Sequence, residues 1–393
     1  MKRLTYLILG TLLTATAVSA QPRTYADTEK LYSTAPSRTE IITPKVNGYN
    51  CYTADLHVHT MFSDGEITPA ERVKEAWIDG LDIMAITDHI ETRRQEREML
   101  KFLKGYSPEK KGFEPINVRC SRGVPADERG IVSDLNLSTE LARAAVKNYP
   151  GLTIIKGTEI SREPVHIGHY CALFTTDNNA LYSTDDAQTI RNARAQGALI
   201  THNHPGWERT STDYTEFEKG IYAEGLIDGI EISNGSSFYP EIVRRAIDKK
   251  LYMVSATDIH ATTASIYGKA NFYRNMTLIF AKNTSEEEIR KALLSQRTLG
   301  YSAGYIIGEK SLLTDFFRAS VTAKRVADSS KGAIVEVANH TSFPYTLRYG
   351  TRILQLDAMS KISLTVKSAE LSFIVENMIH VDYQHPTITL TIN

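Results

Sequence analysis

The sequence predicts an α/β barrel of seven strands, followed by a small all-β domain. Three observations support this fold class. From about residue 50, short apolar runs alternate with helical patterns. Polar residues gather at the carboxyl ends of these runs. From about Ser329 the helical patterns stop, and short alternating strands follow one another with turn residues between them. We therefore divide the chain into a barrel over residues 49–328 and a β module over residues 329–393.

Residues 1–20 have the pattern of a secretory signal peptide. Two basic residues precede an apolar run that ends in small residues, and the run is shorter than a transmembrane anchor requires. We expect cleavage before Gln21 and an N-terminal extension over residues 21–48. The mature protein would be exported, either periplasmic or secreted, without a membrane anchor.

Composition and charge limit the class of partner. The chain has 393 residues, 42% of them hydrophobic, so it can bury a large core. Its 45 basic and 46 acidic residues give a formal net charge of -1. This balance gives no electrostatic reason to expect a nucleic acid or an anionic membrane as partner. We expect a small-molecule substrate, and the oligomeric state stays open.

Seven apolar runs predict the barrel strands. They lie at residues 51–60, 81–89, 152–161, 168–175, 198–205, 225–233 and 251–260. Nearly continuous apolar strands that are each followed by a helix indicate a parallel sheet. Seven such strands suit a closed barrel, and an open doubly wound sheet is the alternative.

The first connecting helix has clear start and stop signals. Thr68 can cap it, Pro69 can open the first turn, Glu71 can complete a capping box and Gly80 can end it. Residues 91–150 form an insertion that is too long and too rich in charge, Pro and Gly to be one connecting helix.

Histidine and acidic residues occupy nearly every strand end. They are His57, His59, Asp88, His89, Glu159, His202, His204, Asp258 and His260. His169 differs, because it lies at the start of its run. The carboxyl ends of parallel barrel strands converge on one mouth, where active sites of such folds lie. Because side chains two residues apart in a strand share a face, His57 and His59 should enter the same pocket.

This cluster predicts a metal site. One histidine on an apolar strand is usually a hydrogen-bonded core residue, but that explanation does not extend to five strand ends. Burial of so many titratable groups is costly unless cations offset their charge. Mixed imidazole and carboxylate ligands suit Zn, Mn or Fe better than Ca.

The motifs also resemble a known family. DLHVHTMFSDG, AITDH, KGTEIS, GHYCALF, NHPGW and SATDIH resemble, in this order, the polymerase and histidinol phosphatase (PHP) domain. The resemblance covers roughly residues 50 to 300. It implies a distorted (β/α)7 barrel that holds two or three divalent metal ions. Within the family, the chain is most similar to exported phosphoesterases and phosphodiesterases with a small C-terminal β domain.

The resemblance also implies which residues bind which ion. One ion would be bound by His57, His59, Glu159 and Asp258, a second by Glu159, His169 and His204, and a third by Asp64, His89 and His260. Glu159 would bridge the first two ions. His166 is the alternative to His169, and His202 is the alternative to His204.

Such a site predicts hydrolysis of a phosphodiester by a metal-bridging hydroxide. The preference for diesters rests on the subgroup resemblance and on the absence of a basic cluster suited to a doubly charged phosphate. One alternative is a phosphomonoesterase that acts on a small sugar or amino-alcohol phosphate. Another is a metal-binding scaffold without turnover.

Other residues are candidates for catalysis or substrate contact. Arg162 could contact the phosphate, although it could equally be a solvated loop residue. His202, His166 or Asp88 could donate a proton to the leaving group, and Asp88 could instead orient His89. Three residues could contact substrate at the barrel mouth, namely Trp207 by stacking, Glu231 by hydrogen bonding and His166 as a substrate-facing histidine.

Overall fold

The computed structural model describes residues 36–91, 116–119, 130–161 and 165–393. The predicted signal peptide, residues 21–35 of the predicted extension and Arg162 lie outside the described residues. Residues 38–393 form one compact unit, and the description below concerns this unit. Within the described residues, every helix is too short or too polar to cross a membrane.

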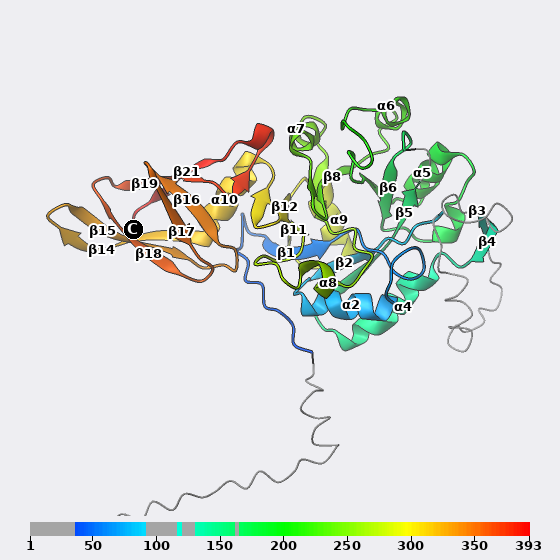
Figure 1. The fold of residues 1–393 in the computed structure, drawn as a ribbon, viewed down its shortest axis with the longest axis horizontal. Coiled ribbons are helices and arrows are strands. Elements are labelled where there is room, and N and C mark those ends of the chain that lie inside the picture. The colour runs from blue at the N-terminus through cyan, green and yellow to red at the C-terminus, as the bar shows by residue number, and fades with distance from the viewer. Residues whose placement is uncertain (1–35, 92–115, 120–129, 162–164) are drawn as a thin grey trace, which may run out of the picture. The chain divides into compact units, whose positions relative to one another are not determined.

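The main sheet is built from strands that lie far apart in the sequence (Figure 1). These are β1 (Asn50–Asp55), β2 (Ile83–Ile86), β5 (Thr153–Ser161), β6 (His169–Leu173), β7 (Leu199–His202), β8 (Gly229–Asn234), β9 (Ser237–Phe238), β10 (Tyr252–Ala256), β11 (Met276–Ala281), β12 (Thr298–Ser302), β13 (Tyr305–Ile307) and β20 (Met378–Ile379). Their order is β10-β8-β7-β6-β5-β2-β1-β11-β12-β13-β20, and β9 pairs with β8. The first seven strands in this order correspond to the seven predicted runs. The predicted α/β class is confirmed.

The sheet curls so that its first strand, β10, approaches β11 and β12. Side chains make several of the bonds there: the Met253 amide donates to Thr298 Oγ1 at 3.1 Å, and the Ser255 amide donates to Thr277 Oγ1 at 3.0 Å. Among the described strands, no backbone ladder joins β10 to either neighbour. The sheet is therefore a curled half-barrel and contains more strands than the seven expected.

Strand β6 departs from the predicted parallel arrangement. It is antiparallel to both β5 and β7, with Ser161 opposite His169 and Tyr170 opposite His202. The connection from β5 is only residues 162–168, which is too short for a parallel crossover. An antiparallel strand starts where its parallel neighbours end. This direction explains why His169, at the start of its run, still lies at the mouth of the barrel.

Helices connect and cover the strands. They are α2 (Pro69–Ile78), α4 (Leu137–Ala145), α5 (Asp186–Ala195), α6 (Glu216–Ala223), α7 (Pro240–Asp248), α8 (Thr263–Tyr267), α9 (Glu286–Leu294) and α10 (Lys310–Ser320), with short 3-10 helices at Val146–Asn148, Asn178–Ala180 and Val381–Tyr383. Thr68 caps α2 as predicted by accepting a bond from the Glu71 amide, although the Glu71 side chain does not complete the box. In the insertion, β3 (Ile116–Arg119) pairs with β4 (Gly130–Ser133), and α4 packs on α2.

The C-terminal strands form two small sheets (Figure 1). One contains β14 (Val321–Ser329), β15 (Gly332–Asn339) and β18 (Lys361–Val366), and the other contains β16 (Tyr345–Tyr349), β17 (Arg352–Leu356), β19 (Glu370–Val375) and β21 (Thr387–Thr391). Buried residues of both sheets, such as Val335 and Phe373, belong to one hydrophobic cluster with Phe280 of the main sheet. Strand β20 pairs with β13. The β region and the barrel therefore share a core.

Candidate metal centre

The loop after β1 folds back on itself and brings Asp64 beside His59. The Gly65 amide donates to the Thr60 carbonyl at 3.0 Å. A Cβ at Gly65 would lie 2.8 Å from the His59 carbonyl carbon, so the turn has no room for a side chain. As a result Asp64 Oδ1 lies 3.7 Å from His59 Nδ1.

Asp88 anchors this loop and is not placed to act as an acid. It is 4% exposed. Its Oδ1 accepts from the Thr60 amide and from Ser63 Oγ, and its Oδ2 accepts from Thr60 Oγ1, each at 2.7 Å. Three donors of this loop thus occupy the buried carboxylate. The proposed proton-donor role for Asp88 does not fit this geometry, and Asp88 instead fixes the loop that follows His59.

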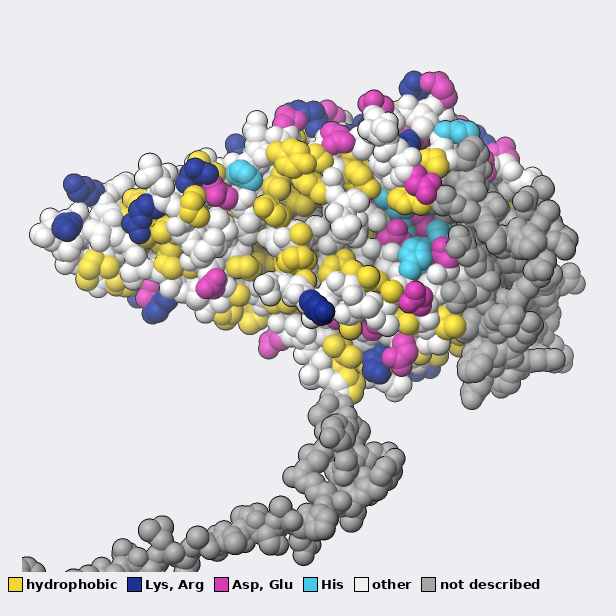
Figure 2. Space-filling view, in the orientation of Figure 1, with side chains coloured by type: hydrophobic (Ala, Val, Ile, Leu, Met, Phe, Trp, Pro, Cys, Tyr) yellow, Lys and Arg dark blue, Asp and Glu magenta, His cyan; other side chains and the backbone are white. Residues whose placement is uncertain are grey.

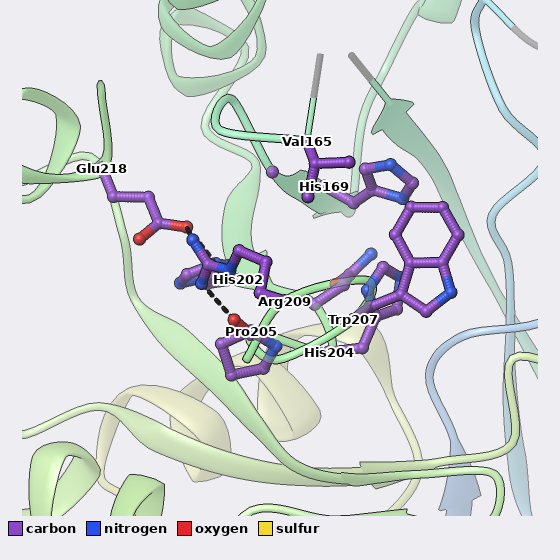
Figure 3. A pocket seen from close by; sticks show the side chains of 10 residues that line it. Val165, His169, His202, His204, Pro205, Trp207, Arg209 and Glu218 are labelled. Carbon is purple, nitrogen blue, oxygen red and sulfur yellow. Dashed lines mark hydrogen bonds and ion pairs between the residues drawn. The ribbon is translucent and has the colours of Figure 1, made fainter. Parts of the chain in front are cut away.

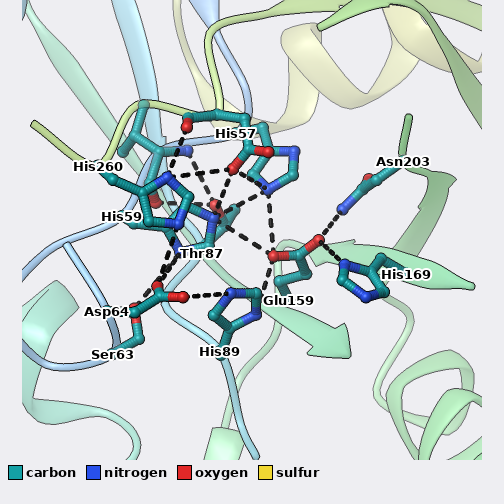
Figure 4. Close-up of polar contacts among 12 residues, drawn as sticks. His57, His59, Ser63, Asp64, Thr87, His89, Glu159, His169, Asn203 and His260 are labelled. Carbon is teal, nitrogen blue, oxygen red and sulfur yellow. Dashed lines mark hydrogen bonds and ion pairs between the residues drawn. The ribbon is translucent and has the colours of Figure 1, made fainter. Parts of the chain in front are cut away.

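The structure brings all nine predicted ligands together. Figure 4 labels His57, His59, Asp64, His89, Glu159, His169 and His260 among them. Their side-chain atoms form three sets, in each of which the atoms lie within 4.8 Å of one another: His57, His59, Glu159 and Asp258; Glu159, His169 and His204; and His59, Asp64, His89 and His260. Glu159 and His59 each belong to two sets. The shared use of His59 was not expected from the sequence.

Glu159 lies at the centre of the cluster and is fully buried. Its Oε2 is 2.9 Å from His89 Nδ1 and 3.2 Å from His57 Nε2. Its Oε1 is 3.4 Å from His169 Nδ1 and 3.5 Å from His204 Nε2. The two oxygens of one carboxylate therefore face different sets, an arrangement that suits a bridging ligand.

Several atoms of the cluster fit a divalent cation better than they fit one another. Asp64 Oδ1, Glu159 Oε2 and Asp258 Oδ1 are buried and accept no hydrogen bond of acceptable geometry, although an imidazole nitrogen lies within 3.2 Å of each. Buried polar atoms without partners are uncommon and need an explanation. Oxygens that converge with imidazole nitrogens form the donor set that Zn, Mn or Fe prefer. The residues present thus fit a metal centre.

The charges of the ligand side chains lead to the same conclusion. Burial alone would lower the pKa values of His57 and His89, but the surrounding carboxylates, Asp258 and Glu159 foremost, raise both well above the ordinary value. Burial would raise the pKa of Glu159, yet these two histidines hold it well below its usual range. The pKa of Asp64 is also lowered, against burial, mainly by His89. The carboxylates therefore require positive charge nearby, which protons supply when no metal is bound.

Two ligands have unusual backbone conformations. His204 has φ of 22° and Asp258 has φ of 51°, both in the left-handed region. Such a conformation costs on the order of 1–3 kcal/mol for a residue with a side chain, and it is found mainly at functional sites. The fold therefore accepts a cost in stability to direct these two side chains into the cluster.

Buried residues that the sequence did not single out hold the ligands in place. Arg72 of α2 is fully buried, and its Nε and Nη2 donate to the carbonyls of His59 and His260, both at 3.0 Å. Asn203 Nδ2 donates to Glu159 Oε1 at 2.7 Å. In the sequence, Asn203 lies between two candidate histidines, and this position could have indicated that it supports the site. An arginine in a helical pattern gives no comparable signal, because its contacts come from distant segments.

His202 faces away from the ligand sets (Figure 3). Its Nε2 is 3.3 Å from Glu218 Oε1, and its Nδ1 is 3.0 Å from the Tyr222 hydroxyl. Glu218 in turn accepts from Arg209 at 2.9 Å. Burial lowers the pKa of His202, which disfavours its protonated form. This position does not fit the predicted proton donor or the alternative ligand role, and His204 is the member of the pair that joins the ligands.

The three predicted substrate residues have different surroundings. The half-buried Trp207 packs beside two ligands, with ring centroids 5.0 Å from His169 and 5.6 Å from His204. His166 is exposed, and its backbone carbonyl accepts from Thr215. Glu231 is fully buried, and its Oε1 lies 2.8 Å from His57 Nδ1. Contact of Glu231 with substrate does not fit this position behind a ligand.

Solvent reaches the ligands to different extents. Figure 2 shows histidine and acidic side chains gathered in one place on the surface. The side chain of His260 is 38% exposed, that of Asp258 20% and that of Asp64 16%. His57, His59 and Glu159 lie deeper, with side chains at most 1% exposed. A substrate would therefore approach the side on which Asp64, Asp258 and His260 lie.

Comparisons with known proteins agree with this geometry. The PHP domain family matches residues 55–184. A crystal structure from Bacteroides vulgatus ATCC 8482, described as a two-domain protein containing a predicted PHP-like metal-dependent phosphoesterase, is 30% identical with a TM-score of 0.77. The alignment covers 91% of this chain and 100% of that one. The chain belongs to the PHP family. This membership confirms the resemblance inferred from the six motifs.

Other solved structures match less of the chain, at lower identity. A lesion-specific endonuclease from Pyrococcus furiosus is 18% identical, with a TM-score of 0.40, and the alignment covers 66% of this chain and 59% of that one. An amidohydrolase from Chromobacterium violaceum is 16% identical, with a TM-score of 0.34, over 54% of this chain and 89% of that one. No match was found among curated proteins. The match to the PHP domain and to a protein described as a PHP-like metal-dependent phosphoesterase supports the prediction that this chain is a hydrolase.

Proposed function

We propose that this PHP protein is an exported phosphodiesterase that uses two or three divalent ions, Zn, Mn or Fe. The observation that supports it best is the sharing of Glu159 and His59 between ligand sets. Shared ligands require neighbouring ions to lie close together, which is the arrangement used for hydrolysis of phosphate esters. The bound ions would polarise the phosphoryl oxygens and lower the pKa of a water molecule.

The protein residues would hold and orient the reacting groups. Glu159 fixes the separation of two sets, because each of its oxygens faces a different one. Asp64 and His260 hold the third set on the solvent side, with Asp64 Oδ1 3.2 Å from His260 Nε2. Trp207, beside His169, is positioned to pack against the leaving group of a bound ester.

The paired state of nearby arginines supports a diester over a monoester. Arg274 is bonded to Asp55 at 2.5 Å, and Arg209 to Glu218 at 2.9 Å. These cations are already neutralised, whereas the second negative charge of a monoester would need additional positive charge. Arg162 lies outside the described residues and remains a candidate for contact with a nonbridging oxygen.

A pair of chromogenic substrates tests the reaction. Purified protein loaded with Mn or Zn should hydrolyse bis(p-nitrophenyl) phosphate with a higher kcat/KM than p-nitrophenyl phosphate. The reverse ratio would indicate a monoesterase acting on a small phosphate. Metal bound without turnover of either ester would indicate a scaffold. Elemental analysis that finds fewer than two ions per chain would contradict the polynuclear site.

We also infer export from the N-terminal sequence, together with a small-molecule partner and no binding to nucleic acid. The basic start, apolar run and small residues before Gln21 support this inference. Fractionation of expressing cells, followed by N-terminal sequencing, should find the mature protein outside the cytoplasm and starting near Gln21. A cytoplasmic protein that retains Met1 would contradict it.

A further inference from the structure

Glu231 connects two of the ligand sets from behind. It lies in β8 and is fully buried. Its Oε1 is 2.8 Å from His57 Nδ1, and its Oε2 accepts from the backbone amide of His204 at 2.7 Å and from Asn234 Nδ2 at 2.9 Å. One carboxylate thus contacts a ring in the first set and the backbone of a ligand in the second.

The bonds at Oε2 determine what Oε1 can do. A backbone amide can only donate, and the Asn234 side chain presents its NH2 group here, so Oε2 must be an acceptor. The other carboxylate oxygen, Oε1, lies 2.8 Å from His57 Nδ1. As an acceptor, it pairs with a protonated Nδ1, which donates the hydrogen bond. The lone pair of a neutral His57 then lies on Nε2, which faces Glu159 at 3.2 Å and His59 at 3.0 Å.

The bond to His204 acts on the backbone. His204 has φ of 22°, a conformation that a histidine rarely adopts without support. The Glu231 carboxylate accepts a hydrogen bond from the backbone amide of His204. The imidazole of His204 faces Glu159, with Nε2 3.5 Å from Oε1. The same side chain therefore stabilises the strained backbone that directs the second ligand.

We propose that Glu231 is a positioning residue that sets the His57 tautomer and the His204 backbone together, so that metal binding in the first two sets depends on it. Glu231 does not contact substrate. This inference rests on the metal centre of the proposed function but not on the identity of the ester.

An isosteric substitution gives a specific expectation. In Glu231→Gln, the amide oxygen must remain opposite the His204 amide and Asn234, because both are donors. The amide NH2 group then faces His57 Nδ1 and donates to it. The proton of a neutral His57 is displaced to Nε2, which removes the lone pair that faces the ligand set. Loss of such outer hydrogen bonds typically weakens metal binding about 10–100-fold.

Metal binding to the full chain tests this directly. Wild type and Glu231→Gln are dialysed against Zn or Mn in chelator buffers, and bound metal is measured by elemental analysis. We expect the variant to lose about 10–100-fold in affinity at two of its ions. Glu218→Gln is the matched control, because Glu218 is equally buried but contacts none of the nine predicted ligands. Unchanged affinity in Glu231→Gln, or equal loss in the control, would overturn the proposal.

A second measurement does not depend on how well the variant folds. Long-range ¹H–¹⁵N spectra of zinc-loaded wild-type protein should show His57 protonated at Nδ1 and metal-bound at Nε2. The opposite pattern, or a wild-type protein that binds no metal, would also overturn the proposal. If wild type binds metal but hydrolyses neither chromogenic ester, the proposed phosphodiesterase function fails, while the role of Glu231 is still decided by affinity and tautomer.

Discussion

The Nε2 atoms of His57 and His59 lie 3.0 Å apart at the centre of the site. On His57, the opposite ring nitrogen is bonded to Glu231, so Nε2 is free to offer a lone pair. Two imidazole nitrogens at this distance, with Asp258 Oδ1 2.9 Å from His59 Nε2, are best reconciled by a cation or a proton between them. Which of the two occupies the site should depend on pH.

Metal binding should therefore strengthen as pH rises. The pKa values of His57 and His89 are raised by neighbouring carboxylates despite burial, and imidazoles must lose their protons before they bind metal. In competition titrations with a chelator, the apparent Kd for Zn should fall steadily between pH 6 and pH 8.5. A Kd that does not change with pH would show that protons do not occupy the metal-free site.

The metal-free protein should show the opposite trend in stability. Because the pKa values of these histidines are higher in the folded than in the unfolded state, their contribution is complete below about pH 6.5 and is lost as pH rises through the raised values. Glu159 and Asp64 have lowered pKa values, so their contribution is present above about pH 4.5 and is lost in acid. Calorimetry of chelator-treated protein should give a higher Tm at pH 6 than at pH 8.5.

Replacement of the shared carboxylate should affect two sets at once. Glu159→Gln should lower bound metal by more than one ion per chain, because Oε2 of Glu159 faces His57 of one set and Oε1 faces His169 of another. We expect kcat/KM to fall by at least about 10²–10³-fold, the loss seen when a main electrostatic stabiliser is removed. His166→Ala, at an exposed position outside the three sets, is the control for metal content. Loss of a single ion would mean that Glu159 does not bridge.

The substitution Asp88→Asn tests whether Asp88 anchors the loop after His59 or donates a proton during catalysis. The Asp88 carboxylate accepts bonds from Thr60 and Ser63, and an amide cannot accept all of them. We expect a loss of about 1–3 kcal/mol in the free energy of unfolding, as for other buried unsatisfied groups. Residual activity should keep the wild-type pH profile. Disappearance of one limb of that profile, with stability unchanged, would restore Asp88 as the proton donor.

Gly65→Ala tests the turn that returns Asp64 to the site. The added Cβ would lie 2.8 Å from backbone atoms of His59 and Thr60, so the loop must shift. Asp64 belongs only to the set with His89 and His260, so we expect the main loss of metal in that set. Elemental analysis should find one ion fewer per chain than in wild type. Gly197→Ala is the control, because its Cβ would meet no atom within 4 Å, although its φ of +80° brings a backbone cost of its own.

The sequence by itself determined the family and the types of side chain that meet at the site. Strand patterns and polar strand ends are local features, so His57, His59 and Asp258 could be placed at the mouth from spacing alone. The motifs that contain them identified the PHP family, which the comparison with the B. vulgatus protein confirms. The α/β class followed from the same alternation of apolar runs and helical patterns.

Only the tertiary structure decided the direction of strand β6 and the hydrogen-bond partners of the buried carboxylates. The antiparallel course of β6 places His169 at the mouth, and it depends on how neighbouring strands pair. Asp88 and Glu231 are acidic residues at strand ends, so the sequence made them candidates for catalysis or substrate contact. Contacts with distant segments instead make Asp88 an anchor of the loop after His59 and Glu231 a support for His57. Such contacts join residues 25 to 174 positions apart, and local spacing does not encode them. Sequence spacing thus assigned the groups at the site, and packing assigned the direction in which each group points.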